Sequence, residues 1–477
     1  MAFEMGILGD FIRVQGGFAY KSQDFSSTGK NPVLKIKNVR FGVIDYSDTE
    51  FVSDELASQT ENWATREGDV LISMTGSGPN APQSLVGRVA RVWENEPKSW
   101  INQRVGRLQL KTENAIDLDF VFYLLSLTQS QEFLVSNSTG SANQANISAK
   151  IIELLPCPKI SYDQSKNIAD IFKSLDRKII LNRQINQTLE QMAQTLFKSW
   201  FVDFDPVIDN ALDAGNDIPD TLQERAEQRR LLRAKADFKP LPVETRALFP
   251  SEFEETELGW VPKGWEVRKI KEFAVVIKGI SYKSSELTES KTALVTLKSF
   301  NRGGGYRLDG LKEYSGKYKT EQIVKAGDLV VAYTDVTQAA DIIGKPALVV
   351  DNPKYEKLVI SLDVSVVRTN LDIYKTFFYN LMKTEAFQNH TLSYTSGTTV
   401  LHLSKDAVPE YEFFCPNVEL VEVFDNIVNK HYSSINLNIN ENIMLENIRN
   451  TLLPKLISGE LALDDLPEEI AEAAEAV

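Results

Sequence analysis

At 477 residues the chain is longer than one hydrophobic core normally accommodates, so two or more domains are expected. Its 43% hydrophobic and 25% charged residues exclude a disordered or collagen-like chain, and no apolar run is long enough to span a membrane. A net charge of −14, two cysteines and three histidines argue against DNA binding through bulk charge, a disulfide framework and a zinc site. We therefore expect a cytoplasmic protein without a metal.

The charge is unevenly distributed along the chain. Residues 260–412 carry 21 basic and 18 acidic residues, whereas residues 413–477 carry 3 and 12. If the protein binds DNA, it needs local basic patches or a more basic partner, because the mean charge opposes binding to phosphates.

The first and second halves of the chain share short words in the same order, at an offset of about 256–262 residues. The paired words are 17–22 with 279–284, 67–72 with 326–331, 87–88 with 344–345, 138–141 with 395–398, and 155–158 with 413–416. One shared word would be chance, but five in one order indicate an internal duplication.

Each half is predicted to begin with a mixed α/β part, residues 1–158 and 260–416. Short β-branched and aromatic runs bounded by Gly, Asn and Pro predict strands, for example at 33–36 and 347–350. One helix is expected in each part, near 120–133 and 374–387. The fold class is therefore α+β, with two similar domains.

A long helix is predicted after each α/β part, over 159–201 and 417–457. Apolar residues recur every three or four positions, which is the pattern of a helix packed against another helix. In the first helix these positions are Ile168, Ile171, Leu175, Ile179, Ile185, Leu189, Met192, Leu196 and Trp200, with Asn182 among them. In the second they are Phe424, Ile427, Ile435, Leu445, Ile448, Leu452 and Leu456, with Asn438 among them.

These two stripes favour an antiparallel coiled coil with pseudo-two-fold symmetry, in which Asn182 and Asn438 would meet and fix the register. The alternative is that each helix packs only on its own domain. Residues 202–259 are interpreted as a linker that contains a basic helix within 222–237, and residues 458–477 as an acidic tail. Such a basic helix is usually solvated, although a contact with DNA or a subunit is the alternative.

No catalytic motif is found in the sequence. An amino-methyltransferase needs an Asn/Asp-Pro-Pro-aromatic turn, and the chain contains no Pro-Pro pair. A phosphate-binding loop needs Gly-Lys-Ser/Thr, which is also missing. We therefore expect a chain without an active site, with an enzyme of unrecognised type as an alternative.

The order of several words resembles the specificity subunit of type I restriction–modification systems. The words are 17–22 (GFAYKS), 68–71 (GDVL), 101–105 (INQRV), 200–207 (WFVDFDPV) and 257–267 (ELGWVPKGWEV). The likeness covers nearly the whole chain. The second half departs from it at 361–363, where Ser-Leu-Asp replaces Asn-Gln-Arg.

This resemblance implies that 1–158 and 260–416 are target-recognition domains, each reading one half of a split double-stranded DNA target, with the coiled coil setting the spacer. It also implies two modification subunits that methylate adenine with S-adenosylmethionine, and restriction subunits that use ATP and Mg²⁺. The chain itself would be non-catalytic and hold no cofactor. The alternative from another class is a scaffold whose duplicated domains bind protein rather than DNA.

Candidate DNA contacts follow from residue chemistry at the repeated words. Hydroxyl and lysine groups in Gly-led turns suit phosphates, and amide and guanidinium groups suit base edges. The candidates for phosphate contact are Tyr20, Lys21, Ser22, Arg88, Tyr282, Lys283, Ser284 and Lys345, and those for base contact are Asn102, Gln103 and Arg104. The alternative for each is a structural role in a turn or at the edge of the core.

Overall fold

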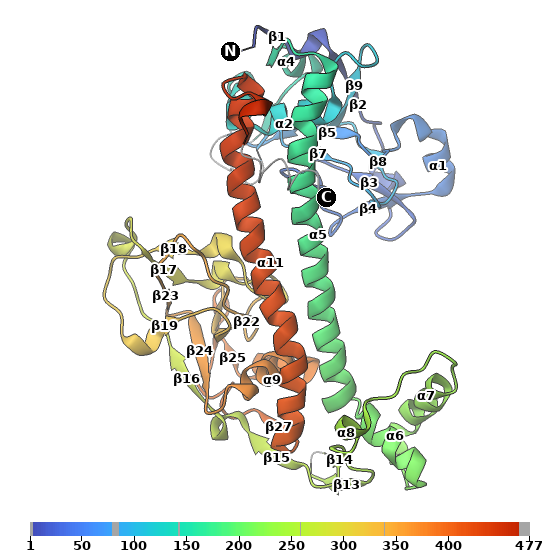
Figure 1. Cartoon of the computed structure of the whole chain (residues 1–477), viewed down its shortest axis with the longest axis vertical. Coiled ribbons are helices and arrows are strands. Elements are labelled where there is room, and N and C mark those ends of the chain that lie inside the picture. The colour runs from blue at the N-terminus through green and yellow to red at the C-terminus, as the bar shows by residue number, and fades with distance from the viewer. Residues whose placement is uncertain (1–2, 79–84, 142–143, 258, 338, 467–477) are drawn as a thin grey trace. The chain divides into compact units, whose positions relative to one another are not determined.

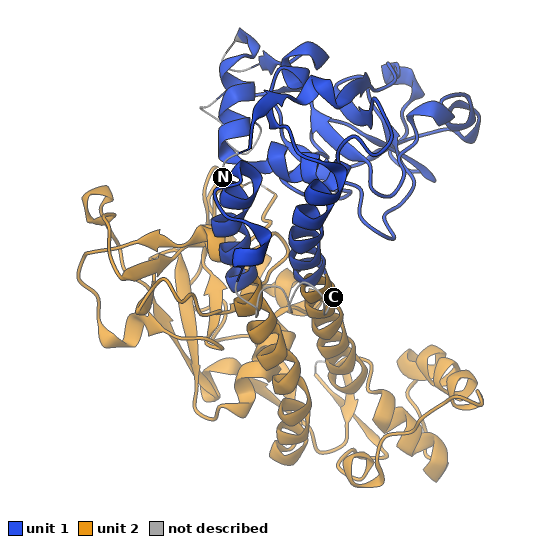
Figure 2. Ribbon diagram, turned by 45° about the horizontal axis from the view of Figure 1, so that its top comes forward, with its two compact units in different colours: residues 1–180, 443–477 blue, residues 181–442 orange. Residues whose placement is uncertain are grey.

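The computed structural model describes residues 3–78, 85–141, 144–257, 259–337 and 339–466. The chain divides into two compact units, residues 1–180 with 443–477, and residues 181–442 (Figure 2). Within the described ranges, no helix is both long and apolar enough to cross a membrane.

Unit 1 holds the first α/β part, which consists of small sheets. Their strand orders are β2-β9-β5-β7, β4-β3-β8, β10-β11-β6 and β1-β12. The strands are β1 (Met5–Ile7), β2 (Ile12–Gly16), β3 (Asn31–Leu34), β4 (Glu50–Val52), β5 (Val70–Ser73), β6 (Thr75–Gly76), β7 (Val89–Arg91), β8 (Trp100–Ile101), β9 (Val105–Leu110), β10 (Thr139–Ser141), β11 (Gln144–Asn146) and β12 (Pro156–Pro158). The pairs are antiparallel except β3 with β8, which is parallel.

Unit 2 holds the second α/β part, and its sheets follow the same plan. Their orders are β16-β24-β20-β22, β18-β17-β23-β19, β21-β26-β25 and β15-β27, with β17 and β23 parallel. The strands are β15 (Glu266–Lys269), β16 (Ala274–Lys278), β17 (Thr292–Val295), β18 (Lys312–Glu313), β19 (Ile323–Val324), β20 (Leu329–Ala332), β21 (Thr334–Asp335), β22 (Pro346–Leu348), β23 (Lys357–Ile360), β24 (Val364–Thr369), β25 (Thr395–Ser396), β26 (Leu401–Leu403) and β27 (Glu412–Cys415). A separate hairpin, β13 (Phe253–Thr256) with β14 (Gly259–Pro262), precedes them.

Each predicted mid-domain helix is in fact two helices. In unit 1 these are α2 (Leu118–Ser126) and α3 (Thr128–Ser136), separated by Leu127, whose ψ of 142° is extended. In unit 2 they are α9 (Ile373–Met382) and α10 (Glu385–Ser393). Unit 1 also contains the short helices α1 (Asp54–Gln59) and α4 (Ala149–Glu153). A period of 3.6 residues continues across such a break, which explains why the pattern alone predicts a single helix.

Two long helices, α5 (Tyr162–Phe201) and α11 (Val418–Ser458), contribute to both units (Figure 1). In unit 1, Arg449 Nη1 of α11 donates to Asp176 Oδ1 of α5 over 2.5 Å, and Tyr123 Oη donates to Asp176 Oδ2 over 2.9 Å. The helix α11 continues through Pro454 to Ser458.

The helix pair of unit 2 runs antiparallel, but the predicted asparagine contact is wrong. Asn182 Nδ2 donates to Asn442 Oδ1 over 2.9 Å, and Asn438 Nδ2 donates to Asn186 Oδ1 over 2.8 Å. The register is thus shifted by four residues, one helical turn, from direct pairing of the equivalent positions. The sequence repeat relates Asn182 to Asn438, but it does not determine the axial register in which the two helices pack.

Most of the predicted stripe is buried or half-buried, with two exceptions in α5. Ile185 and Met192 are 40% and 50% exposed. Phe197 and Phe201, which lie between stripe positions, are buried instead and contact Phe424 with ring centroids 5.7 and 5.2 Å apart. The stripe therefore turns around the helix toward the aromatic core of unit 2.

Residues between α5 and β13 form three helices, α6 (Asp205–Ala214), α7 (Gln223–Arg233) and α8 (Val243–Arg246). The first part of the predicted linker 202–259 is therefore helical rather than extended. Phe204 precedes it with φ 56° and ψ 32°, a left-handed conformation that turns the chain sharply between α5 and α6.

Candidate nucleic-acid interface

The turn at 17–22 in unit 1 begins with Gly17, at a position where the neighbouring backbone leaves no room for a side chain. A Cβ on Gly17 would lie 2.1 Å from the carbonyl oxygen of Asn102, and Phe18 bridges Asn102 in the parallel sense. This contact brings the loop with Gln103 and Arg104, both exposed, against the start of the turn with Lys21 and Ser22, also exposed. Four of the candidate residues are therefore neighbours on the surface, while Asn102 is half-buried beneath them.

Tyr20 does not join this surface. Its side chain is 6% exposed and packs in a small core, and its hydroxyl lies 2.8 Å from Thr60 Oγ1. Burial raises the pKa of the phenol. Tyr20 is a structural residue, so its assignment as a phosphate contact is corrected. The position of Tyr20 three residues after the glycine of the turn does not show whether its side chain faces the core or the solvent.

The equivalent turn in unit 2 has the same backbone but a different surface. A Cβ on Gly279 would lie 2.1 Å from the carbonyl oxygen of Ser361, as at Gly17. Tyr282 is half-buried, and Lys283 and Ser284 are exposed. Lys312 of β18, which the sequence did not single out, donates to Tyr282 Oη over 3.4 Å and lies 5.7 Å from the ring centroid. The three lysines within 312–319 were the available signal for this group.

Arg88 is also corrected from a DNA contact to a structural residue. It is 2% exposed, Nε donates to the carbonyl oxygen of Val39 over 2.8 Å, and Nη2 donates to that of Ile36 over 2.7 Å. Burial lowers the pKa of this guanidinium. The repeated Gly before it, with φ 81°, marks a turn and explains the shared word without any ligand.

Lys345, the equivalent of Arg88, is half-buried next to Gly344, which has φ 71°. Burial lowers the pKa of its ammonium, and Asp341 opposes that shift. It is therefore less accessible than the lysines of the 279–284 turn, and a phosphate contact there stays a prediction.

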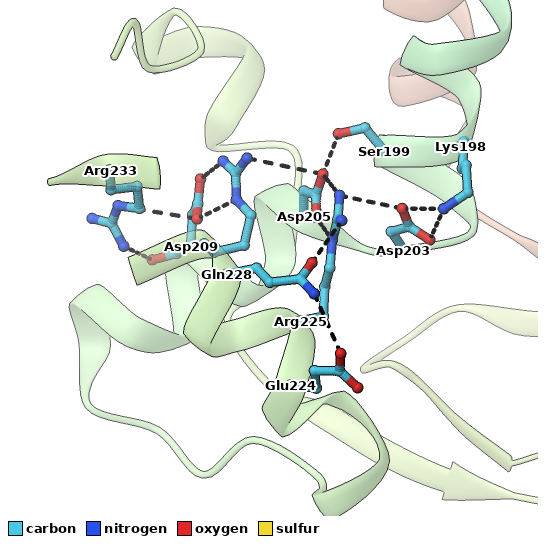
Figure 3. A network of polar contacts seen from close by, with 10 residues as sticks. Lys198, Ser199, Asp203, Asp205, Asp209, Glu224, Arg225, Gln228 and Arg233 are labelled. Carbon is cyan, nitrogen blue, oxygen red and sulfur yellow. Dashed lines mark hydrogen bonds and ion pairs between the residues drawn. The ribbon is translucent and has the colours of Figure 1, made fainter. Parts of the chain in front are cut away.

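The basic helix α7 is not a free cationic face. Its Arg225, Arg229 and Arg233, one turn apart, pair with Asp205, Asp209 and Asp213 of α6, also one turn apart (Figure 3). Arg225 contacts Asp205 through two bonds of 2.7 Å, and Asp205 also accepts from Ser199 Oγ of α5 over 2.7 Å. The Asp205 side chain is only 4% exposed. These arginines therefore hold α6 and α7 together rather than offering charge to DNA.

The described residues contain no group of three or more His, Cys, Asp or Glu side chains placed to hold a metal ion. The two cysteines occupy matching strands, β12 and β27. Burial raises the pKa of the Cys157 thiol to about 12 and that of Cys415 to about 11.

Comparison with known proteins extends the reading of the sequence. Residues 2–191 match the type I restriction modification DNA specificity domain. The chain is 25% identical over 422 residues to the HindI specificity subunit of Haemophilus influenzae, covering 83% of this chain and 87% of that one. It is 21% identical over 448 residues to the MjaVIII specificity subunit of Methanocaldococcus jannaschii, covering 92% and 91%. The fold is similar to that of a type I restriction–modification S subunit from M. genitalium, with a TM-score of 0.53 and 15% identity over 95% and 96% of the two chains.

Residues 2–191 therefore match a domain of the DNA-specificity class, and the chain is similar over most of its length to specificity subunits of type I restriction–modification systems.

Proposed function

We propose that this subunit reads a bipartite double-stranded DNA target, with the α/β part of each unit recognising one half. The observation that carries this proposal is the match of strand orders between the two parts: three sheets agree strand for strand, and the fourth, which contains the parallel pair in each part, has one additional strand, β19, in unit 2. Such a match supports a duplication, and a duplicated domain suits a DNA duplex with two half-sites. The exposed groups at Lys21, Arg104 and Lys283 are the proposed contacts.

The helices α5 and α11 are proposed to form the coiled coil that sets the spacer between half-sites. Support comes from their contacts within each unit: Asp176 with Arg449 in unit 1, and Asn182 with Asn442 in unit 2. A spacer made of paired helices resists bending, so its length would determine the separation of two half-sites.

The chain is further proposed to act without catalysis of its own. Two modification subunits would supply S-adenosylmethionine-dependent adenine methylation, and restriction subunits would supply ATP- and Mg²⁺-dependent cleavage. The sequence lacks a methyl-transfer turn and a phosphate-binding loop, which supports this division of labour.

A domain exchange tests the bipartite proposal directly. Residues 1–155 are replaced by the equivalent part of a relative, and the methylated sites of the assembled complex are mapped by sequencing. We expect one half of the target to change and the other to stay. If both halves change, the two parts do not read independently; if purified chain binds no DNA with or without modification subunits, a protein-binding scaffold becomes the better account.

A paired insertion tests the spacer. Four residues are added after Ile180 in α5 and four after Asn442 in α11, which lengthens both helices by about one turn, or about 6 Å. We expect both half-sequences to be retained and the gap between them to widen by roughly two base pairs, at about 3.4 Å each. An unchanged gap with retained methylation would show that the helices do not set the spacing.

A further inference from the structure

The repeated turn lies in different electrostatic surroundings in the two units. In unit 1, β4 and α1 lie beside Tyr20, and they carry Glu50, Asp54 and Glu55. In unit 2, the strand equivalent to β4 is β18, which carries Lys312 against Tyr282. The same turn thus lies beside three carboxylates in unit 1 and beside one lysine, Lys312, and one carboxylate, Glu313, in unit 2.

The lysines of these two surfaces differ in their partners. Near the unit 1 turn, Lys35 pairs with Glu50, Lys37 with Asp48 over 2.7 Å, and Lys98 with Glu61 over 2.6 Å. Ion pairing removes most of the field that would attract a phosphate. In unit 2, four lysines near the turn make no ion pair with any described residue, and in unit 1 the same holds for Lys21, the equivalent of Lys283; the four are Lys278, Lys283, Lys312 and Lys317.

Contacts between two segments of unit 2 bring Lys283 near Lys312 and Lys317, and Lys278 ends β16 just before the turn; we call these four lysines the basic surface. Lys312 contacts Tyr282, one residue before Lys283. The amide of Ser315 donates to the carbonyl oxygen of Glu286 over 2.9 Å, which joins the chain after β18 to the chain after the turn. Tyr314 Oη donates to the carbonyl oxygen of Lys317 over 3.0 Å within the first of these segments. The nearest carboxylates are engaged: Glu286 accepts from the Lys283 amide, and Glu313 pairs with Lys354.

We infer that the basic surface of unit 2 makes most of the phosphate contacts of the DNA complex, while unit 1 holds its half-site with few. The inference rests on the proposed function. It adds that unit 2 contributes more than unit 1 to the salt-dependent part of the DNA-binding free energy. The net charges of the two α/β parts support this inference, because residues 260–412 are net basic whereas residues 1–155 carry 14 basic and 18 acidic residues. Each released counterion steepens the fall of affinity with salt, so the contribution of each unit can be measured separately.

The test measures fluorescence anisotropy of a labelled duplex of mixed sequence with the full chain assembled with its modification subunits, between roughly 50 and 200 mM salt. For the double variant K283A/K317A, both exposed, we expect weaker binding at low salt and a plot of log affinity against log salt that is shallower by about 0.9 for each lysine. The matched control is K263A/K271A, which removes two exposed unit 2 lysines already paired with Glu252 and Glu410 and leaves the slope unchanged.

The single variants K21A and K283A compare the equivalent positions, and we expect K21A to change the slope less. A slope unchanged in K283A/K317A, an equal change in K263A/K271A, or an equal change in K21A and K283A overturns the inference while leaving DNA recognition intact. A wild-type complex that binds no duplex at any of these salt concentrations instead contradicts the proposed function itself.

Discussion

The long helices of the two units carry different side chains at positions that the sequence offset of 256 residues relates. At equivalent positions 256 residues apart, unit 2 has Trp200, Phe197 and Phe424 where unit 1 has Leu456, Leu453 and Ile168, and all six are buried. In unit 2 the rings contact one another edge to face, as between Phe197 and Phe424. At these three pairs of positions the buried side chain is thus aromatic in unit 2 and aliphatic in unit 1, whereas at Phe172 of unit 1 and Val428 of unit 2 the order is reversed.

Unit 2 also contains the helix pair α6–α7, which lies beside the end of α5. Trp200 contacts Phe249, which follows α8, with ring centroids 5.2 Å apart and planes at 86°. The aromatic core thus extends to cover this additional helical segment. The comparison predicts that truncation at these three pairs of positions costs more in unit 2, where the side chains are aromatic, than in unit 1, where they are aliphatic.

The largest expected effect is the loss of the central ring. Trp200→Ala removes a side chain that is 1% exposed and should destabilise the protein by about 3–5 kcal/mol. Leu456→Ala, at the equivalent and equally buried position, is the matched variant and should cost about 2–3 kcal/mol. Calorimetric melting of both measures the difference; equal losses would contradict the aromatic–aliphatic contrast.

The second prediction concerns the ion pairs between α6 and α7 in unit 2. Asp205→Ala leaves Arg225 without its buried partner and should cost about 3 kcal/mol. Asp213→Ala breaks the ion pairs with Arg233 and Arg246 at a carboxylate that is 48% exposed, and should cost about 1 kcal/mol or less. Urea denaturation of the two variants gives the comparison. Similar losses for both would show that burial does not govern the strength of these pairs.

The sequence predicted the long helices, the strand-rich parts and the repeat because these depend on local periodicity and on short words. It did not predict the α6–α7 pairing, although acids at 205, 209 and 213 and arginines at 225, 229 and 233 share a four-residue spacing. That spacing was the available signal. Arg88 was misassigned for a related reason, since a guanidinium that donates to Val39 and Ile36 reads the same in sequence as one that faces solvent.

The third prediction tests the asparagine contacts of unit 2. Asn182→Leu leaves the side chain of Asn442, 8% exposed, without this donor and should cost about 1–3 kcal/mol. The double variant Asn182→Leu with Asn442→Leu removes both polar groups and should recover most of that loss. Pairing Asn182→Leu with Asn438→Leu, the equivalent positions of the repeat, should give no recovery. Recovery in that second pair alone would indicate the unshifted register.

The smallest expected effect lies in unit 1 and depends on pH. Burial raises the pKa of Glu96 from 4.5 to about 7, and the hydroxyl of Tyr46 donates to its carboxylate over 3.4 Å. A carboxyl that binds its proton more tightly when folded stabilises the protein below its unfolded pKa, and this stabilisation is lost as pH rises through about 7. Relative to Glu96→Gln, the wild type should therefore lose about 1 kcal/mol between about pH 5 and pH 8, less than the full shift implies because the carboxyl is partly exposed. Glu113→Gln, at an exposed carboxyl of the same α/β part, serves as the control and should follow the wild-type profile. Melting temperatures measured across this range decide the matter: a wild type and a Glu96→Gln variant with parallel profiles would mean that Glu96 is ionised throughout, and the pH dependence of unit 1 would have to arise elsewhere.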